Sequence, residues 1–305
     1  MQTVAIVNPV AGRRQAHHKW LPLLEASGRL GARVVTWWTE GPGHAEGLAA
    51  RARREGFQRV VAVGGDGTLF EVANGLWWEP QGALPSLGMV PLGTGCDYVR
   101  NFSLNASLQE HLLTALSEPT AAVSAGVFRC AWPGAAPRPQ IFLNHLGAGF
   151  DANVVAHMRQ WRLPFRGKPP YFLAGLREMV SLKSYHFRGT VDGAPVDTEA
   201  AIFVAGLGRS FGGGLLITPQ ASPQAQRFQA LWITGVSRLG LLKMFAGGLA
   251  GKPLLHPGMH TARPRKVMLT SDPPAWIEAE GELVGQTPLE VEVRAHAFQV
   301  AIHGI

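Results

Sequence analysis

A glycine-rich turn in the first quarter of the chain has residue types that suit phosphate chemistry. Gly64-Gly65-Asp66-Gly67-Thr68 directly follows the apolar run Val60–Val63. Glycines let a ligand approach the main chain, and free amides at a helix start attract phosphate. Asp66 would repel a phosphate unless a cation lay between them, so the turn predicts a nucleotide phosphate site with Mg²⁺ or a basic residue nearby. The alternative is a tight strand–helix turn in which Asp66 only caps an amide.

The residues after this turn predict the start of a helix. Thr68-Leu69-Phe70-Glu71 matches a capping box, in which Thr68 is the N-cap and the Glu71 side chain returns to it. We therefore expect the helix to begin at Thr68, on the carboxyl end of a strand.

Two further loops of small residues also follow apolar runs. Asn8–Arg13 (NPVAGR) follows Thr3–Val7, and Pro91–Asp97 (PLGTGCD) lies at the end of the run that starts at Ser86. Open α/β sheets bind ligands at the carboxyl ends of their strands, so we expect the three loops to converge. None of them matches the P-loop pattern G-x-x-x-x-G-K-[ST], and no G-x-G-x-x-G follows the first strand.

The first third of the chain alternates predicted strands with predicted helices. Its apolar runs are continuous, which is typical of a parallel sheet covered on both faces. The expected strands are 3–7, 33–39, 59–63 and 86–93, and the expected helices lie within 17–30, 44–56, 68–78 and 107–119.

From about Val123 the pattern changes to short strands between glycine and proline turns. Such spacing predicts an antiparallel sandwich or barrel, with helical interruptions at 171–182 and 239–249. We expect one continuous strand over 140–150 and another over 276–284. An unbroken strand would put Glu278, Glu280 and Glu282 on one face, and a bend at Gly281 is the alternative. The predicted fold class is an α/β N-terminal domain with a parallel sheet and a mainly antiparallel β-sandwich C-terminal domain.

The motifs together resemble the diacylglycerol kinase catalytic family, which includes bacterial lipid kinases and the sphingosine and ceramide kinases. The chain contains N-P-x-x-G-[KR], G-G-D-G-T-x-x-E and P-x-G-T-x-x-D in this order. The second of these elements is also similar to that of NAD kinases. Phe211–Ala221 (FGGGLLITPQA) and Ala279–Val293 (AEGELVGQTPLEVEV) resemble the lipid-kinase second domain, whose patterns are FGGGM-x-x-x-P-x-A and D-G-E. Because the motifs cover nearly the whole chain, they favour the lipid-kinase branch.

The resemblance implies a kinase that uses ATP and Mg²⁺. It implies an α/β nucleotide-binding domain over 1–121, a β-rich lipid or substrate domain over 122–296, and a last strand, 297–305, that returns to the first domain. Asp66 and Asp97 would organise Mg²⁺ through water, and Glu280 occupies the place of the family's general base. The positions implied to surround ATP are Asn8, Pro9, Gly12, Arg13, Thr39, Gly64, Gly65, Asp66, Gly67, Thr68, Glu71, Gly93 and Thr94.

Several positions depart from the family's pattern. Cys96 stands where an Asn usually precedes the Asp, and Ser124 stands where an Asp usually follows the interdomain crossover. Ala225-Gln226 replaces an Asp-Gly that is a metal site in bacterial relatives, which argues against a structural Mg²⁺ in the second domain. Glu280 is one methylene longer than the family's Asp. No cluster of His and Cys has metal-ligand spacing, so no metal site built from protein ligands alone is predicted.

Composition limits the partners and the compartment. A net charge of +7 favours anionic partners such as nucleotides and phospholipid surfaces, and no motif supports nucleic-acid binding. Met158–Phe172 interleaves basic and aromatic residues, which suits an anionic membrane surface; a solvated loop over an aromatic cluster is the alternative. The two cysteines, the lack of a signal-peptide pattern and the lack of a long apolar run predict a cytoplasmic protein, peripheral at the inner membrane face. The oligomeric state is left open, a homodimer included.

Three functions are compatible with these features. The leading hypothesis is an ATP-dependent lipid kinase that transfers the γ-phosphate to a hydroxyl of diacylglycerol or a similar lipid. The second is a kinase of a soluble acceptor such as NAD. The third is a catalytically weakened nucleotide- or lipid-binding relative, for which the changes at Ser124 and Ala225 argue.

Overall fold

The computed structural model describes residues 1–28, 34–102, 106–117, 120–134, 136–160, 168–249, 252 and 255–301. By its internal contacts the chain divides into two compact units. The first unit comprises residues 1–123 and 296–305, and the second comprises residues 124–295. The division predicted from the sequence placed the boundaries after residues 121 and 296.

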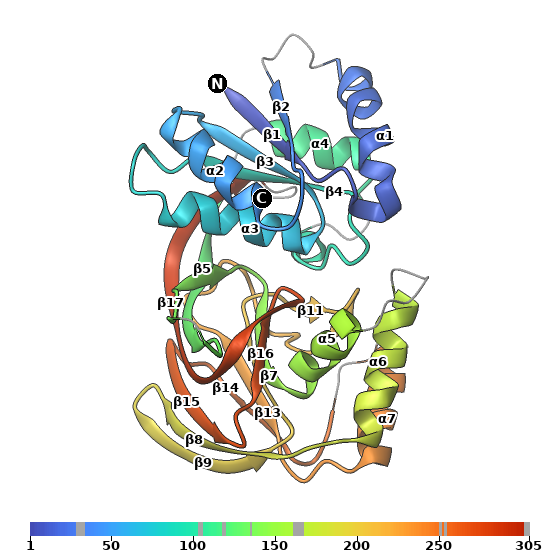
Figure 1. Ribbon diagram of the computed structural model, residues 1–305, viewed down its shortest axis with the longest axis vertical. Coiled ribbons are helices and arrows are strands. Elements are labelled where there is room, and N and C mark those ends of the chain that lie inside the picture. The colour runs from blue at the N-terminus through green and yellow to red at the C-terminus, as the bar shows by residue number, and fades with distance from the viewer. Residues whose placement is uncertain are drawn as a thin grey trace. The chain divides into compact units, whose positions relative to one another are not determined.

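The first unit is a parallel sheet with helices on both faces (Figure 1). Its strands lie in the order β2-β1-β3-β4, and the end of β17 pairs with β4. The elements are β1 Thr3–Val7, α1 Ala11–Ala26, β2 Val34–Trp38, α2 His44–Arg54, β3 Arg59–Gly64, α3 Asp66–Trp78, β4 Ser86–Pro91, the 3₁₀ helix η2 Val99–Asn101 and α4 Leu108–Leu116. The predicted α/β domain with a parallel sheet is confirmed.

Helices α1 and α4 cover one face of this sheet, while α2 and α3 pack against each other on the opposite face (Figure 1). The core under α1 and α4 comprises Ala5, Val7, Ala16, Trp20, Leu24, Val61, Val63, Val90, Leu92, Leu112 and Ala115. Trp20 is fully buried and donates its indole N–H to Thr36 Oγ1 at 3.0 Å, as a buried tryptophan requires. The parallel register pairs Val7 with Trp38 and with Val63, so the strands end at one edge.

The second unit is antiparallel throughout its described strand pairs. Its main order is β14-β13-β10-β7-β16-β17; β15 links β17 to β8, β9 pairs with β8, and β5 pairs with β17 and β6. The elements are β5 Thr120–Ala131, β6 Gln140–Phe142, β7 His145–Gly149, α5 Phe150–Gln160, α6 Lys168–Val180, β8 Tyr185–Val191, β9 Ala194–Ala200, β10 Ile202–Gly206, β11 Ser210–Phe211, β12 Leu215–Leu216, β13 Gln229–Ile233, α7 Arg238–Leu249, β14 Met259–Ala262, β15 Lys266–Asp272, β16 Trp276–Ala279 and β17 Glu282–Ala301. The predicted antiparallel, β-rich second domain is confirmed.

Two strands expected to be continuous are interrupted. The prediction for 140–150 was wrong, and for 276–284 the alternative with a bend at Gly281 is confirmed. The segment 140–150 is β6 followed by β7, because the chain leaves the ladder at Leu143 and Asn144. The segment 276–284 is a hairpin whose two turn residues, Glu280 and Gly281, have φ of +54° and +80°. A two-residue turn with left-handed backbone reverses the chain, so Glu278, Glu280 and Glu282 do not share a face.

Three helices close one side of the second unit. α5, α6 and α7 share a buried core with β10 and β13, which includes Phe150, Val154, Ala174, Met179, Ile202, Val204, Leu231, Ile233, Leu241 and Met244. α6 and α7 were predicted, whereas α5 was not. Among the described residues, none of the helices is both long enough and apolar enough to span a membrane. Residues 161–167 of the predicted membrane segment lie outside the described residues.

Candidate active site

Three loops of the first unit meet at the carboxyl edge of its parallel sheet. Asn8, directly after β1, donates from Nδ2 to Thr68 Oγ1 in the first turn of α3 at 3.2 Å. Asn8 Oδ1 accepts the Val10 N–H at 3.1 Å, which fixes the entry to α1. The N–H groups of Leu92 and Gly93, after β4, both donate to the Gly64 carbonyl at 2.9 Å. The predicted convergence of the loops is therefore present.

Glycine is required where these loops touch. Gly12 has φ of +57°, and a Cβ on it would lie 2.2 Å from the Leu92 carbonyl oxygen. A Cβ on Gly93 would lie 2.3 Å from Gly65 Cα. Backbone thus packs on backbone across the site, at a distance that leaves no room for a side chain.

Helix α3 begins earlier than its sequence predicts. The helix starts at Asp66, its N-cap is Gly65, and the first helical bond joins the Leu69 N–H to the Gly65 carbonyl. The prediction of a capping box was wrong, because the Glu71 carboxylate accepts the N–H groups of Gly43 and Ala45 at 2.8 and 3.1 Å. Glu71 therefore caps α2 from outside, and the amides of the first α3 turn precede any bond within the helix.

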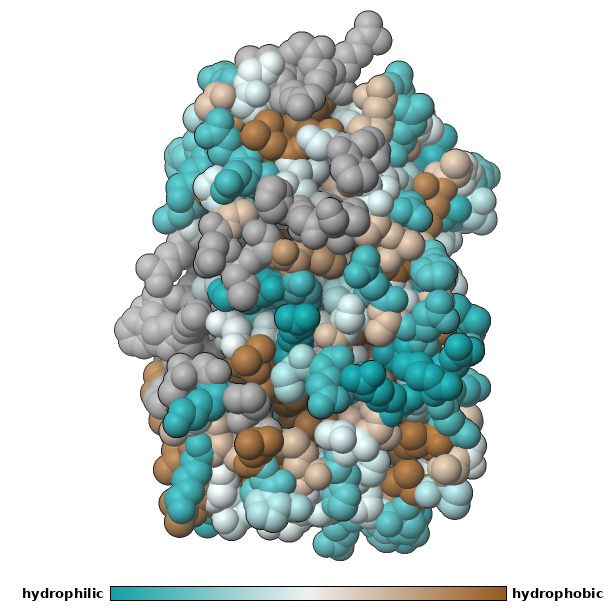
Figure 2. Space-filling view, turned by 180° about the vertical axis from the view of Figure 1, so that it is seen from behind, coloured by the Kyte–Doolittle hydropathy of each residue, from teal (hydrophilic) through white to brown (hydrophobic). Residues whose placement is uncertain are grey.

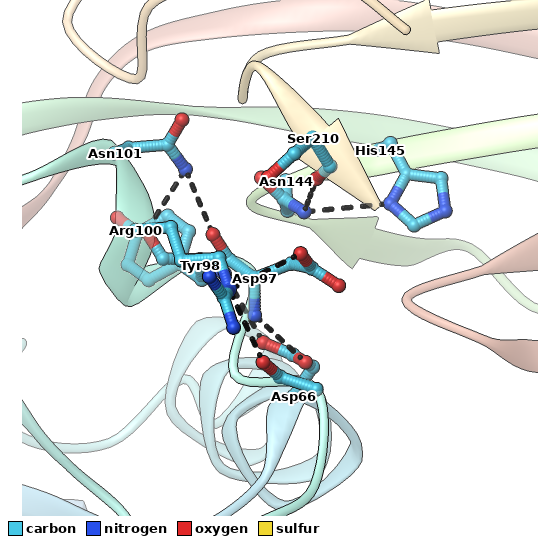
Figure 3. A network of polar contacts seen from close by, with 9 residues as sticks. Asp66, Asp97, Tyr98, Arg100, Asn101, Asn144, His145 and Ser210 are labelled. Carbon is cyan, nitrogen blue, oxygen red and sulfur yellow. Dashed lines mark hydrogen bonds and ion pairs between the residues drawn. The ribbon is translucent and has the colours of Figure 1, made fainter. Parts of the chain in front are cut away.

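Asp66 joins the α3 turn to the loop that follows β4 (Figure 3). Its Oδ2 accepts the Asp97 N–H and its Oδ1 accepts the Tyr98 N–H, each at 3.1 Å. The Asp97 carboxylate is buried and lies 3.6 Å from Arg100 Nε. A Cβ on Gly95 would lie 3.1 Å from Asp66 Oδ2 and 3.5 Å from Asp97 Oδ2, so both carboxylates flank one glycine.

These two carboxylates fit a magnesium ion bound mainly through water. Mg²⁺ usually keeps several waters and uses one or two carboxylates together with the phosphates of a substrate. An ionised carboxylate has about four acceptor positions, so it can bind amides and water molecules at the same time. No group of three or more His, Cys, Asp or Glu side chains that could hold a metal by themselves occurs in the described part of the chain.

Cys96 stands between these two carboxylates in sequence and has no features of a nucleophile. Burial and then the neighbouring Asp66 raise the pKa of its thiol to about 12. Its backbone is left-handed, with φ of +51°. Asn adopts this conformation more readily than most residues, which explains the residue usual at this position in the family that the sequence resembles.

The other predicted nucleotide positions have varied surroundings. Thr39 is buried at the end of β2, where its N–H donates to the Val7 carbonyl at 2.9 Å. Thr94 is exposed, and Pro9 and Gly67 are half-buried. The side chain of Arg13 lies outside the described part of the structure. The ATP contacts of all these residues stay predictions.

In the second unit, Glu280 is held by the main chain of the β6–β7 break. Its Oε1 accepts the N–H groups of Leu143 and Asn144 at 2.8 and 2.6 Å, and only 8% of the residue is exposed. Asn144 in turn donates from Nδ2 to the Ser210 carbonyl at 2.9 Å (Figure 3). The break that the strand prediction missed is therefore what holds the predicted base.

A buried charge cluster supports the Glu280 turn. His145 Nε2 lies 2.9 Å from Glu278 Oε1, and Glu278 Oε2 accepts the Gly281 N–H at 2.8 Å. Burial lowers the pKa of His145, but the carboxylates of Glu278, Glu280 and Asp151 together outweigh burial and raise the pKa to about 10. Burial and then Glu278 raise the pKa of Asp151 well above its usual range.

Comparisons with known proteins match this chain over nearly its full length. Residues 2–128 match the diacylglycerol kinase catalytic domain, and residues 144–302 match the YegS C-terminal NAD kinase beta sandwich-like domain. The chain belongs to the diacylglycerol kinase catalytic family. A diacylglycerol kinase of Staphylococcus haemolyticus (strain JCSC1435) is 26% identical over 93% of this chain and 82% of its own length.

Solved structures share the fold of this family member. A crystal structure of a diacylglycerol kinase from Bacillus anthracis str. Sterne has a TM-score of 0.72 and 18% identity, over 99% of this chain and 97% of that one. Yeast NADH kinase complexed with NADH has a TM-score of 0.51 and 11% identity, over 98% and 82% of the two chains.

Two departures from the diacylglycerol kinase pattern are neighbours. The Ser124 N–H donates to the Pro223 carbonyl at 2.7 Å, in the loop that contains Ala225. Ser124 is fully buried, and its hydroxyl has no hydrogen-bond partner among the described residues. The two positions at which the sequence departs from the expected acidic pattern therefore lie beside each other.

Sequence reasoning missed the residues that hold Glu280. Asn144 and His145 lie within the run that was predicted to be one apolar strand, and neither was predicted to have a role. Asp151 was not singled out either. The polar pair Asn144-His145 inside an apolar run was the available signal. Polar residues within a buried run need partners. Here the His145 side chain pairs with Glu278 of β16, and the Asn144 side chain binds the Ser210 carbonyl.

Proposed function

We propose that the protein is an ATP-dependent lipid kinase that transfers the γ-phosphate to a hydroxyl of diacylglycerol or a similar lipid. The main observation in support of this proposal is that the three small-residue loops after β1, β3 and β4 meet at the edge of the sheet where Asp66 and Asp97 lie. The names of relatives that match over most of the chain support a lipid acceptor.

Each residue then has a chemical role. The amides of the first α3 turn, among them those of Gly67 and Thr68, would bind phosphate oxygens. Asp66 and Asp97 would hold Mg²⁺ through water, and the bound ion would offset the charge of the triphosphate. The hydroxyl oxygen of the acceptor forms a bond to the γ-phosphorus as the bond to the β-phosphate oxygen breaks. Glu280 would take the hydroxyl proton, and ADP would leave.

The net charge supports a peripheral location for this activity. A charge of +7 is attracted to the anionic inner face of a membrane. We therefore propose that the kinase is a cytoplasmic protein that meets its lipid acceptor at that surface.

Phosphate transfer from labelled ATP tests the function directly. The whole chain is incubated with ATP, Mg²⁺ and either mixed lipid vesicles or NAD, and the product is identified by mass spectrometry. A phosphorylated lipid is the expected product. Phosphorylated NAD without phosphorylated lipid would mean that the protein is a kinase of a soluble acceptor. ATP binding without any phosphate transfer would mean that it is a catalytically weakened relative.

Glu280→Gln tests the base. It should keep ATP binding, measured by calorimetry, and lower turnover by about 10²-fold or more. Glu290→Gln is the matched control, because Glu290 is half-exposed on β17 and pairs with Lys266. Full turnover by Glu280→Gln would mean that the base is another residue.

A further inference from the structure

Helix α7 has apolar residues on the side that faces the core and also on its outer side. Leu241 and Met244 face the core of the second unit. Leu239 and Leu242 lie on the opposite side and are 61% and 43% exposed, with exposed Ala246 one turn further on. Exposed apolar residues that gather on one side of a helix are typical of a surface that meets another protein or a membrane. We therefore expect the outer side of α7 to contact an apolar partner.

Helix α6 continues this surface. It packs beside α7, and its exposed positions 173, 177 and 180 repeat at helical spacing on one side. Leu173 is 43% exposed and Val180 is 70% exposed. We define the α6–α7 face as the exposed apolar residues Leu173 and Val180 of α6 and Leu239 and Leu242 of α7. Figure 2 shows brown residues interspersed with teal ones at the lower left, the side on which α6 and α7 lie.

The charges around the α6–α7 face are positive. Arg177, Arg238, Lys243 and Lys252 are all exposed. Neither residues 152–177 nor residues 236–271 contain an Asp or a Glu.

The one carboxylate of α6 does not reach this surface. Glu178 is 2% exposed and accepts a hydrogen bond from Asn153 Nδ2 at 2.7 Å, while its other oxygen lies 2.9 Å from His157 Nε2. In the described part of the chain, α6 and α7 thus contribute apolar side chains and cations to this face, and no exposed carboxylate. This combination suits the interface of a bilayer with anionic headgroups.

We propose that the α6–α7 face docks on an anionic phospholipid bilayer. The apolar side chains enter the interface, and the four cations meet the headgroups. The inference rests on the proposed function, since a lipid acceptor has to be reached in a membrane. A second copy of the chain fits less well, because a two-fold contact through this face would bring the cations of one copy against those of the other.

Vesicle sedimentation of the whole chain tests the apolar part of the face. Vesicles of phosphatidylcholine with phosphatidylglycerol are compared with phosphatidylcholine alone, in the absence of ATP. Leu239→Ser/Leu242→Ser should weaken binding to the anionic vesicles by about tenfold or more. The control Leu21→Ser/Met268→Ser removes two apolar side chains of similar exposure, 48% and 46%, elsewhere on the surface and should change binding less than about twofold. Equal losses in the two variants would overturn the proposal.

Charge is tested separately from apolar area. Lys243→Gln should weaken binding to the anionic vesicles about fivefold, and added salt should reduce this difference. Lys19→Gln, an exposed lysine of the first unit, is the control and should leave binding unchanged. Equal effects of the two lysine variants would overturn the electrostatic part, and dimerisation through Leu239 and Leu242 without vesicle binding would replace the bilayer by a second copy.

The docking face and the kinase activity can fail independently. A short-chain diacylglycerol in detergent micelles supplies the acceptor without a bilayer. If the protein phosphorylates this acceptor but does not bind vesicles, the proposed docking face is wrong and the proposed kinase activity is supported. Vesicle binding with the expected variant effects, but without transfer to any lipid, would leave the docking face and overturn the kinase.

Discussion

Replacing Gly12 by alanine tests how closely two of the three loops have to approach each other. Gly12 lies in the first turn of α1 with φ of +57°, and a Cβ added to it would meet the Leu92 carbonyl oxygen at 2.2 Å. Ordinary contacts of a Cβ begin at 3.4 Å, so the α1 start and the loop after β4 would separate by about 1 Å. Both loops contain residues predicted to surround ATP.

Gly56→Ala separates this clash from backbone strain. Gly56 also has a left-handed backbone, with φ of +78°, but nothing lies within 4 Å of its Cβ position. An alanine in this conformation costs about 1–2 kcal/mol at either site. The clash is added only at Gly12, where a displacement of about 1 Å in a site that positions reacting groups costs on the order of 10²-fold in rate.

The two variants are compared by urea unfolding, calorimetric ATP titration and turnover. Both should lose about 1–2 kcal/mol of unfolding free energy through strain. Only Gly12→Ala should in addition weaken ATP binding and lower turnover by about 10²-fold. Equal ATP affinity and equal turnover in the two variants would show that the contact between these loops does not shape the nucleotide site.

Three further predictions follow from buried groups. Because the folded-state pKa of His145 is raised to about 10, its pairing with Glu278 adds stability that is complete below about pH 6.5 and is lost as the pH rises through about 10. The unfolding free energy measured in urea should fall over that range, and His145→Gln should flatten the dependence; an unchanged slope would contradict the pairing. Cys96→Asn should raise the unfolding free energy by about 1 kcal/mol, because Asn tolerates a left-handed backbone, and a decrease would show that packing of the thiol matters more. Ser124→Ala should be neutral or stabilise by about 1 kcal/mol, because it removes a buried hydroxyl that lacks a partner, whereas a loss above about 1 kcal/mol in chemical denaturation would reveal a bond to that hydroxyl.

The parallel sheet of the first unit was predictable because its strands are continuous apolar runs. Runs such as Val60–Val63 are buried on both faces and end in small residues, and this pattern has few other solutions. The start of α3 was less predictable, because Thr68 and Glu71 match a local capping pattern. Their actual partners, Asn8 and the start of α2, lie far away in the sequence.

The second unit was predicted well in class and poorly in detail. Its turns depend on contacts that no local pattern encodes. The break at Leu143 and Asn144 exists because their amides bind Glu280, more than a hundred residues later in the chain. The hairpin at Glu280 and Gly281 was visible only as one glycine in an acidic stretch.

Because of strand β17, the parallel sheet of the first unit cannot be completed until the end of the chain has been synthesised. The 20 residues of β17 begin in the second unit, and its end pairs with β4 of the first unit at Val300 and Leu87. During translation, β1 to β4 therefore emerge from the ribosome long before the end of β17, which pairs with β4, has been synthesised. Until then β4 is an open sheet edge, which other chains can pair with. The nascent N-terminal unit would thus depend on chaperones, or on rapid completion of translation, to avoid aggregation before its last strand arrives.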